Sequence, residues 1–157
     1  MPLYDHDYPG EYVLNINIVY KNKKDYLDLL LLADEQEDMI DKYLDRGTLF
    51  ALYDDDLKSV CVVTYEGDDV YELQNLATYP QFQKKGYGRH LINHACENYK
   101  DKGVMIVGTG ESLIPFYENS GFELSHCVEN YYVDHYKEPI FDEGVQLKDK
   151  YYLKRRL

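Results

Sequence analysis

The chain has 157 residues, enough for one domain with a substantial core, and its 29 acidic and 17 basic side chains give a formal net charge of −12. This excess of acid argues against a nucleic-acid-binding protein, which needs a basic surface. No apolar run approaches the ~20 residues that a membrane-spanning helix needs, and the N-terminal residues lack the pattern of a secretory signal. We therefore expect a cytoplasmic protein with no membrane and no nucleic-acid partner.

The three cysteines, Cys61, Cys96 and Cys127, are scattered and lack the spacing of metal ligands. Such usage is typical of reduced thiols in a cytoplasmic protein. His90 and His94 do stand at the i, i+4 spacing that metal sites use, but no third ligand pattern accompanies them. We predict no metal site.

The first third of the chain predicts one strand and two helices. Residues 11–20 alternate between apolar and polar types, which indicates a strand. Apolar residues at helical spacing predict helices over 25–33 and 35–46, and Gly47 is expected to stop the second helix. The many acidic side chains of these helices fit a solvated face or the rim of a binding cleft.

The middle of the chain predicts a hairpin, a further strand and a helix. Strands are expected over 48–53 and 57–65, with an acidic turn at 54–56 between them. A third strand is expected over 70–78. A helix with an apolar stripe begins at Gly88 and is expected to end near residue 102.

The last third predicts a short strand, a helix and two closing strands. Residues 104–107 are wholly apolar, which is typical of a strand buried on both faces. A helix is expected over 112–120 and strands over 122–133 and 145–153. The segment between these strands, 134–144, reads as a long loop, and long loops in compact domains are often functional.

Strands followed by an alternation of strand and helix predict one mixed sheet with helices on both faces. The chain shows no repeats, low-complexity segments or linkers. We therefore expect an α/β (α+β) protein that forms a single domain over residues 1–157.

The most informative segment joins the strand over 70–78 to the helix that follows it. Its sequence is Gln83-Lys84-Lys85-Gly86-Tyr87-Gly88-Arg89, which we call the phosphate loop. A helix N-terminus presents unpaired N–H groups and the positive end of the helix dipole, and glycines let a phosphate approach the backbone closely. The pattern Gln-x-x-Gly-x-Gly is neither the Rossmann fingerprint nor the P-loop. It predicts an anion site at the start of this helix.

The flanks of the phosphate loop carry a family resemblance. Leu76-Ala77-Thr78-Tyr79-Pro80 before it and Gly88-Arg89-His90-Leu91-Ile92 at its end resemble motif A of the Gcn5-related N-acetyltransferases, the GNAT family. Further on, Pro115-Phe116-Tyr117-Glu118-Asn119-Ser120-Gly121-Phe122 resembles motif B of that family. The two blocks stand in the right order, and the resemblance, to the bacterial small-molecule type, covers about residues 48–153.

The resemblance implies a fold and a co-substrate. The fold would be a single mixed, mostly antiparallel sheet with splayed central strands, and the co-substrate would be acetyl-CoA. The phosphate loop would bind the pyrophosphate, and the end of the strand would pair with the pantetheine amides as an added strand does. The residues expected to bind acetyl-CoA are Leu76, Ala77, Thr78, Gln83, Lys84, Lys85, Gly86, Tyr87, Gly88 and Arg89.

The resemblance also implies three catalytic roles. The N–H of Leu76 would stabilise the oxyanion of the tetrahedral intermediate. Glu72, eleven residues before Gln83, would act as general base on the amine, although a glutamate on an alternating strand also fits a solvated face. Tyr117 would protonate the leaving thiolate, although it also fits a packed aromatic residue.

The implied activity is direct acetyl transfer to a primary amine. The net charge of −12 suits a small cationic acceptor through long-range attraction, or it serves solubility alone. Two alternatives stay open, a protein or peptide acetyltransferase acting on lysine or an N-terminus, and a non-catalytic acyl-CoA-binding sensor. A homodimer is compatible with the resemblance, since dimers are common among relatives.

Overall fold

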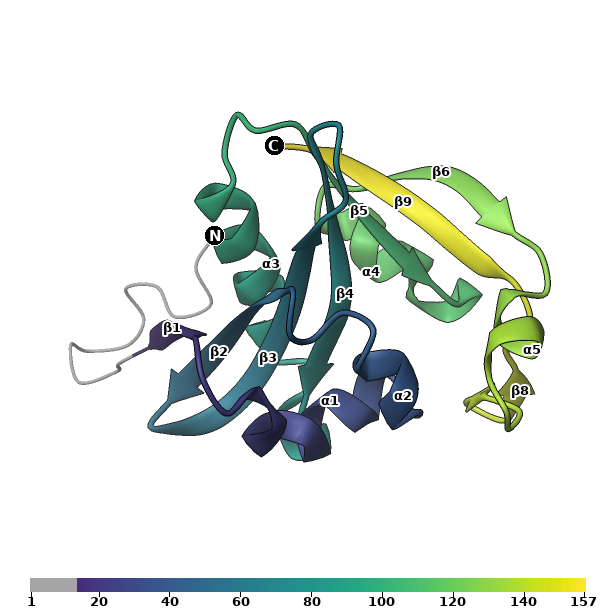
Figure 1. Cartoon of the computed structure of the whole chain (residues 1–157), viewed down its shortest axis with the longest axis horizontal. Helices are drawn as coiled ribbons and strands as arrows, with labels where there is room; N and C mark the ends of the chain where they lie inside the picture. The colour runs from purple at the N-terminus through teal and green to yellow at the C-terminus, as the bar shows by residue number, and fades with distance from the viewer. Residues whose placement is uncertain (1–13) are drawn as a thin grey trace. The chain divides into compact units, whose positions relative to one another are not determined.

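The computed structural model describes residues 14–157 (Figure 1). The chain forms two compact units. The first contains the described residues up to Thr64 together with Gln74–Tyr99, and the second contains Tyr65–Leu73 and Lys100–Leu157. One strand, β4 (Val70–Thr78), contributes its first half to the second unit and its second half to the first.

Seven strands form a mixed sheet in the order β1-β2-β3-β4-β5-β9-β6. β4 and β5 run parallel, whereas β1–β2, β2–β3, β5–β9 and β6–β9 are antiparallel. This confirms the predicted mixed, mostly antiparallel sheet. The other bounds are β1 Asn15–Val19, β2 Thr48–Asp54, β3 Asp56–Tyr65, β5 Val104–Thr109, β6 Glu123–Val128 and β9 Lys150–Arg156.

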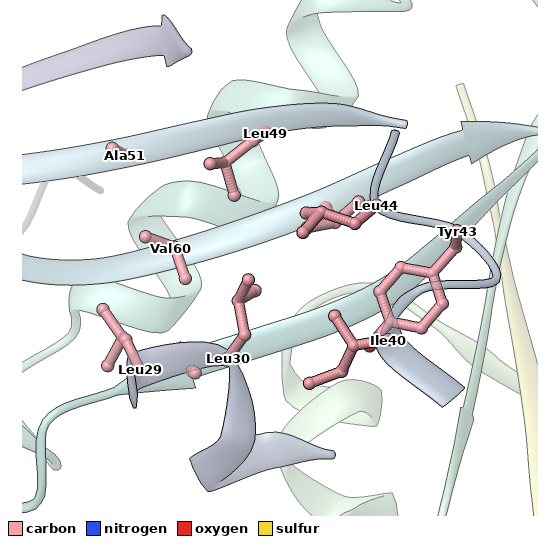
Figure 2. Close-up of a cluster of buried hydrophobic side chains, with 10 residues drawn as sticks. Leu29, Leu30, Ile40, Tyr43, Leu44, Leu49, Ala51 and Val60 are labelled. Atoms are coloured by element: carbon pink, nitrogen blue, oxygen red, sulfur yellow. The ribbon is translucent and has the colours of Figure 1, made fainter. Parts of the chain in front are cut away.

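In the first unit, two short helices cover one face of the strands. They are α1 (Leu27–Ala33), which follows the 3-10 turn η1 (Lys23–Tyr26), and α2 (Glu37–Ile40). Figure 2 shows their apolar side chains gathered against β2 and β3. The cluster contains Leu29, Leu30, Ile40, Tyr43, Leu44, Leu49, Ala51, Val60, Val62 and Ala77.

The opposite face of the same strands is covered by α3 (Tyr87–Asn98). Since side chains alternate along a strand, Phe50 of β2 points away from the α1 cluster. Its ring meets the edges of His94 at 5.7 Å and Tyr99 at 6.4 Å. Both faces of β2 are therefore covered, and its packing against α3 holds the start of that helix, where the phosphate loop ends, against the strands.

In the second unit, α4 (Ile114–Asn119) follows the 3-10 turn η3 (Glu111–Leu113) and contacts β6 and β9. The strand β5 alternates between half-buried and buried residues, with Met105, Val107 and Thr109 buried. The expectation that 104–107 is buried on both faces was therefore wrong. The other face of β5, with Ile106 and Gly108, is only half-buried.

The last third differs most from the sequence-based expectation. The strand expected over 122–133 ends at Val128, and α5 (Tyr131–His135) begins after Asn130, whose φ of 57° turns the backbone out of the strand. The expected loop 134–144 contains the short strand β7 (Phe141–Asp142), which pairs with β8 (Val145–Gln146). The closing strand expected over 145–153 is therefore two strands, β8 and β9.

Smaller corrections concern the first third. The helix expected over 35–46 is regular only over Glu37–Ile40, and a series of turns continues it to Gly47. The strand expected over 11–20 is observed as Asn15–Val19, and residues 11–13 lie outside the described part. Within residues 14–157, the structure contains no helix that is both long and apolar enough to cross a membrane.

Candidate active site

The phosphate loop ends in a helix N-terminus, as its sequence predicted. α3 begins at Tyr87, and Gly86 precedes it with φ 90°, a left-handed conformation that glycine adopts without strain. The N–H of His90 donates to the Gly86 carbonyl at 3.0 Å, which closes the first helical turn. The N–H groups before it have no acceptor within the helix, so they and the exposed Lys84, Lys85 and Arg89 suit an anion.

The segment that leads into the loop is held at both ends. The N–H of Tyr79 donates to the Lys58 carbonyl at 3.2 Å, and Gln83 Nε2 donates to the Thr78 carbonyl at 3.0 Å. The Lys58 ammonium lies 3.7 Å from the centroid of the Phe82 ring, within η2 (Pro80–Phe82). These contacts give the loop a defined shape, because an exposed segment would otherwise sample many conformations.

Tyr87 belongs to the loop through its backbone. Its side chain is buried, and its hydroxyl donates to Asp54 Oδ2 at 2.5 Å, at the turn between β2 and β3. The side chain therefore anchors the start of α3 to the sheet. The backbone of Tyr87 and the next glycine, Gly88, remains the predicted contact to the co-substrate.

The end of β4 carries the other residues predicted to bind acetyl-CoA. The register pairs β4 with β5 only from Val70 to Leu73, although β4 continues to Thr78. Leu76 lies in this later stretch and is half-buried. The Ala77 carbonyl accepts a hydrogen bond from Ser59 Oγ at 2.8 Å, so one backbone group of this stretch already has a partner.

The structure adds two residues that the sequence did not single out. Ser59 lies within 2.8 Å of Thr78 Oγ1 as well as of the Ala77 carbonyl, and Lys58 holds both Tyr79 and Phe82. Both residues belong to β3, the neighbour of β4 in the sheet. No spacing in the sequence marks them, because strand pairing between 58–59 and 77–79 is a tertiary relationship.

Glu72, the predicted general base, lies in the second unit. It is half-buried on β4 and stands opposite Ile106 of β5 in the register. Burial raises the pKa of Tyr152 on β9, and the charges of Glu72, Tyr131 and Glu66 raise it further. The Glu72 carboxylate is therefore within electrostatic reach of Tyr152.

Tyr117, the predicted general acid, lies on α4 of the second unit and is buried. Its ring meets Phe116 at 5.0 Å and Phe122 at 5.8 Å, both nearly perpendicular. The N–H of Phe122 donates to the Tyr117 carbonyl at 3.0 Å. The ring is thus part of the packing of α4, and the catalytic role of its hydroxyl stays a prediction.

The two histidines of α3 take part in packing. Partial burial lowers the pKa of His90 and His94, and the charge of His94 lowers that of His90 further. His94 presents its ring to Phe50. Among residues 14–157, no three His, Cys, Asp or Glu side chains are grouped so that they could hold a metal ion.

A hollow of about 350 Å³ lies beside the β7–β8 hairpin in the second unit. The hydroxyl of Ser112 donates to the Asp142 carboxylate at its edge. The residues that line it include four carboxylates and one lysine: Glu111, Ser112, Asp142, Glu143, Val145, Gln146, Leu147, Lys148, Asp149 and Tyr151.

Comparison with known proteins gives consistent matches along the chain. Residues 45–124 match the acetyltransferase (GNAT) domain family. An uncharacterized N-acetyltransferase of Bacillus subtilis, YvbK, is 34% identical over 142 residues, which cover 87% of this chain and 92% of YvbK.

Two solved structures share the fold over nearly their whole length. A GNAT family acetyltransferase from Elizabethkingia anophelis with acetyl-CoA bound is 28% identical, covers 92% of this chain and 98% of its own, and has a TM-score of 0.86. An IAA acetyltransferase from Bacillus cereus is 29% identical, covers 92% of this chain and 100% of its own, and has a TM-score of 0.85.

The family match includes the end of β4, the phosphate loop and the whole motif B block, the segments that carry the resemblance. That resemblance and the predicted fold are therefore confirmed. With half of its length matched by the family and a 34% identical relative, this chain belongs to the GNAT family of acetyltransferases.

Proposed function

We propose that this protein transfers the acetyl group of acetyl-CoA directly to an amine. The observation that carries the proposal is the start of α3, where a left-handed Gly86 and exposed basic side chains surround N–H groups that have no acceptor within the helix. A similar solved structure, from Elizabethkingia anophelis, has acetyl-CoA bound. In this proposal the pyrophosphate of acetyl-CoA binds at the phosphate loop of the chain.

The other groups of the co-substrate are assigned to the end of β4. Beyond Leu73, β4 continues past its register with β5, and we assign the backbone of Leu76, Ala77 and Thr78 to the pantetheine amides. The Leu76 N–H is assigned to the acetyl oxygen, where it stabilises the negative charge that develops during transfer. The Ser59 hydrogen bond to the Ala77 carbonyl helps hold this stretch in place.

The reaction requires two proton transfers. An alkylamine with a pKa near ~10.4 is protonated at neutral pH, so it must lose a proton before its nitrogen attacks the acetyl carbon. We propose that the Glu72 carboxylate accepts this proton, directly or through water. As the C–S bond breaks, the thiolate of CoA takes a proton, and we propose that the hydroxyl of Tyr117 donates it.

We further propose that the acceptor is a small cationic amine and that the whole chain acts as one catalytic domain. The net charge of −12 supports a cation, because it raises the local concentration of positively charged ligands. The family match runs through residues of both compact units, which supports a single domain.

The test is the release of CoA from acetyl-CoA with polyamines, aminoglycosides, amino acids, lysine peptides and N-terminal peptides, with the acetylated product identified by mass. Release with small amines supports the proposal, whereas release with peptides alone would show that the protein is a protein acetyltransferase. If acetyl-CoA binds in a calorimetric titration but no acceptor reacts, the proposed catalysis is wrong and the protein is a binding protein.

A further inference from the structure

Lys150 places its ammonium group between two tyrosine rings of the second unit. Its Nζ lies 4.2 Å from the centroid of the Tyr131 ring and 5.1 Å from the centroid of the Tyr152 ring. The ring of His126 stacks on Tyr152 with centroids 4.8 Å apart and planes 8° apart, which supports that ring. We call Tyr131 and Tyr152 the aromatic cage. Its chemistry favours an ammonium ion, because the quadrupole of an aromatic ring gives the ring face a negative electrostatic potential.

The stem of Lys150, which is on β9, lies over Gly108 of the neighbouring strand β5. A Cβ atom at Gly108 would lie 2.1 Å from Lys150 Cε and 3.0 Å from Tyr152 Cε1. The flexible stem of Lys150 therefore occupies the space that a side chain at this position would fill. Gly108 stands opposite Tyr152 in the β5–β9 register, so the cage and the lysine stem lie on the same face of the sheet.

Glu72 lies on this face as well. It stands opposite Ile106, two residues before Gly108, so alternation along the strands places Glu72, Gly108 and Tyr152 on one face. Glu72 is on β4 and the cage ring of Tyr152 is on β9, with β5 between them. Two strand spacings and an offset of two residues along the strands separate their backbones by roughly 12 Å, a span that an extended diamine or polyamine can bridge.

We propose that the aromatic cage binds a second ammonium group of the acceptor, and that this group replaces the Lys150 ammonium when the acceptor binds. The inference rests on the proposed function, in which the reacting amine lies at Glu72. It narrows the acceptor class to linear amines with two or more amino groups. Lys150 then acts as a built-in competitor that sets the affinity for such acceptors.

The direction in which the loss of the Lys150 charge changes acceptor affinity distinguishes two roles for this residue. If Lys150 bound an anionic group of the acceptor, its removal would weaken acceptor binding. If it competes for the cage, its removal strengthens the binding of a diamine. A single substitution therefore separates a diamine acceptor from an acceptor that carries a carboxylate.

The experiment compares a linear diamine, the monoamine of the same length and the ω-amino acid of the same length. Lys150→Met keeps an unbranched stem and removes the charge. We expect it to lower KM for the diamine by about 2- to 30-fold, the range for one cation–π contact, with kcat and the KM of the monoamine unchanged. Tyr131→Leu is expected to raise KM for the diamine by a similar factor.

Two exposed residues outside the aromatic cage supply the controls. Lys154→Met removes an exposed lysine from the same strand as Lys150, and Tyr20→Leu removes an exposed tyrosine. Neither is expected to change the preference for the diamine. The inference is overturned if Lys150→Met raises KM for the ω-amino acid. It is also overturned if Lys150→Met and Tyr131→Leu give the same KM for the diamine as their control variants.

A calorimetric titration with the diamine alone separates this inference from the proposed function. If Lys150→Met binds the diamine more tightly and Tyr131→Leu binds it more weakly, the cage is supported. Failure to detect acetyl transfer in the same variants would then contradict the proposed function and not the cage. Turnover of the diamine with all four variants alike would leave the proposed function standing and overturn the cage.

Discussion

The side-chain amide of Asn75 donates a hydrogen bond to the hydroxyl of Tyr43 at 3.0 Å, and both residues are buried. The same amide donates to the Leu30 carbonyl at 3.0 Å, and the Tyr43 hydroxyl donates to Asp34 Oδ2 at 2.9 Å. These bonds connect β4 with α1 and with the turns after α2. They act one residue before Leu76, so the position of the proposed oxyanion donor depends on them.

Tyr43→Phe is expected to lower the free energy of unfolding by about 1–3 kcal/mol, because it leaves a buried amide hydrogen of Asn75 without its acceptor. Urea unfolding measures the change. Tyr20→Phe is the matched control, since Tyr20 is 80% exposed. Equal stability of the two variants would show that the hydroxyl of Tyr43 contributes nothing to the fold.

Tyr117→Phe is expected to lower kcat by roughly 100-fold and to leave the affinity for acetyl-CoA unchanged. The ring still packs between Phe116 and Phe122, so only the proton donor is lost. Steady-state CoA release and an acetyl-CoA titration measure the two quantities. A variant with wild-type kcat would leave Tyr117 with a packing role alone.

Glu72→Gln is expected to reduce turnover most near neutral pH and to recover activity as the pH rises. The amine loses its own proton as the pH approaches ~10.4, so the need for a base falls. The pH dependence of kcat/KM for variant and wild type measures the effect. Glu123→Gln, on exposed β6, is the control. Parallel profiles of Glu72→Gln and wild type would contradict a role as base.

The three cysteines are expected to differ in reactivity toward a thiol reagent. Cys61 and Cys96 are buried and Cys127 is exposed. Burial raises the pKa of the Cys61 thiol, and the neighbouring Cys96 raises it further, so little reactive thiolate forms there. Mass spectrometry of the native protein at about pH 8.5 should find the label on Cys127, with the other two labelled only after unfolding. Early labelling of Cys61 would contradict the packing of β3.

The sequence predicted the order of most elements and the position of the phosphate loop, because both depend on local signals. Alternation gave β2, β3 and β4 within one residue of their observed ends, and helical spacing gave the start of α3 within one residue, although α3 ends at Asn98 and not near residue 102 as expected. The glycine pattern placed the helix start correctly, since a left-handed residue before a helix favours glycine. These signals are contained in a few neighbouring residues.

The segment after β6 was not predicted, because its structure depends on distant contacts. Tyr131, Tyr132 and Val133 have side chains that favour strands, yet they form α5. The rings of Tyr131 and Tyr132 meet at 5.3 Å, and the Lys150 ammonium lies over Tyr131. The N–H of Tyr132 also donates to the Lys148 carbonyl at 3.0 Å. Such contacts between the helix and residues near β9 override local preference.

Gly86→Glu tests the central claim most directly, because it places a negative charge and a side chain where the pyrophosphate of acetyl-CoA is proposed to bind. Gly67→Glu is a close match, since Gly67 has φ 87° against 90° for Gly86, and a Cβ atom at Gly67 meets no atom within 4 Å. Calorimetric titration of acetyl-CoA into both folded variants is the measurement. We predict that Gly86→Glu loses binding while Gly67→Glu keeps the affinity of the wild type; acetyl-CoA binding by Gly86→Glu with unchanged affinity would contradict the assignment of the phosphate loop.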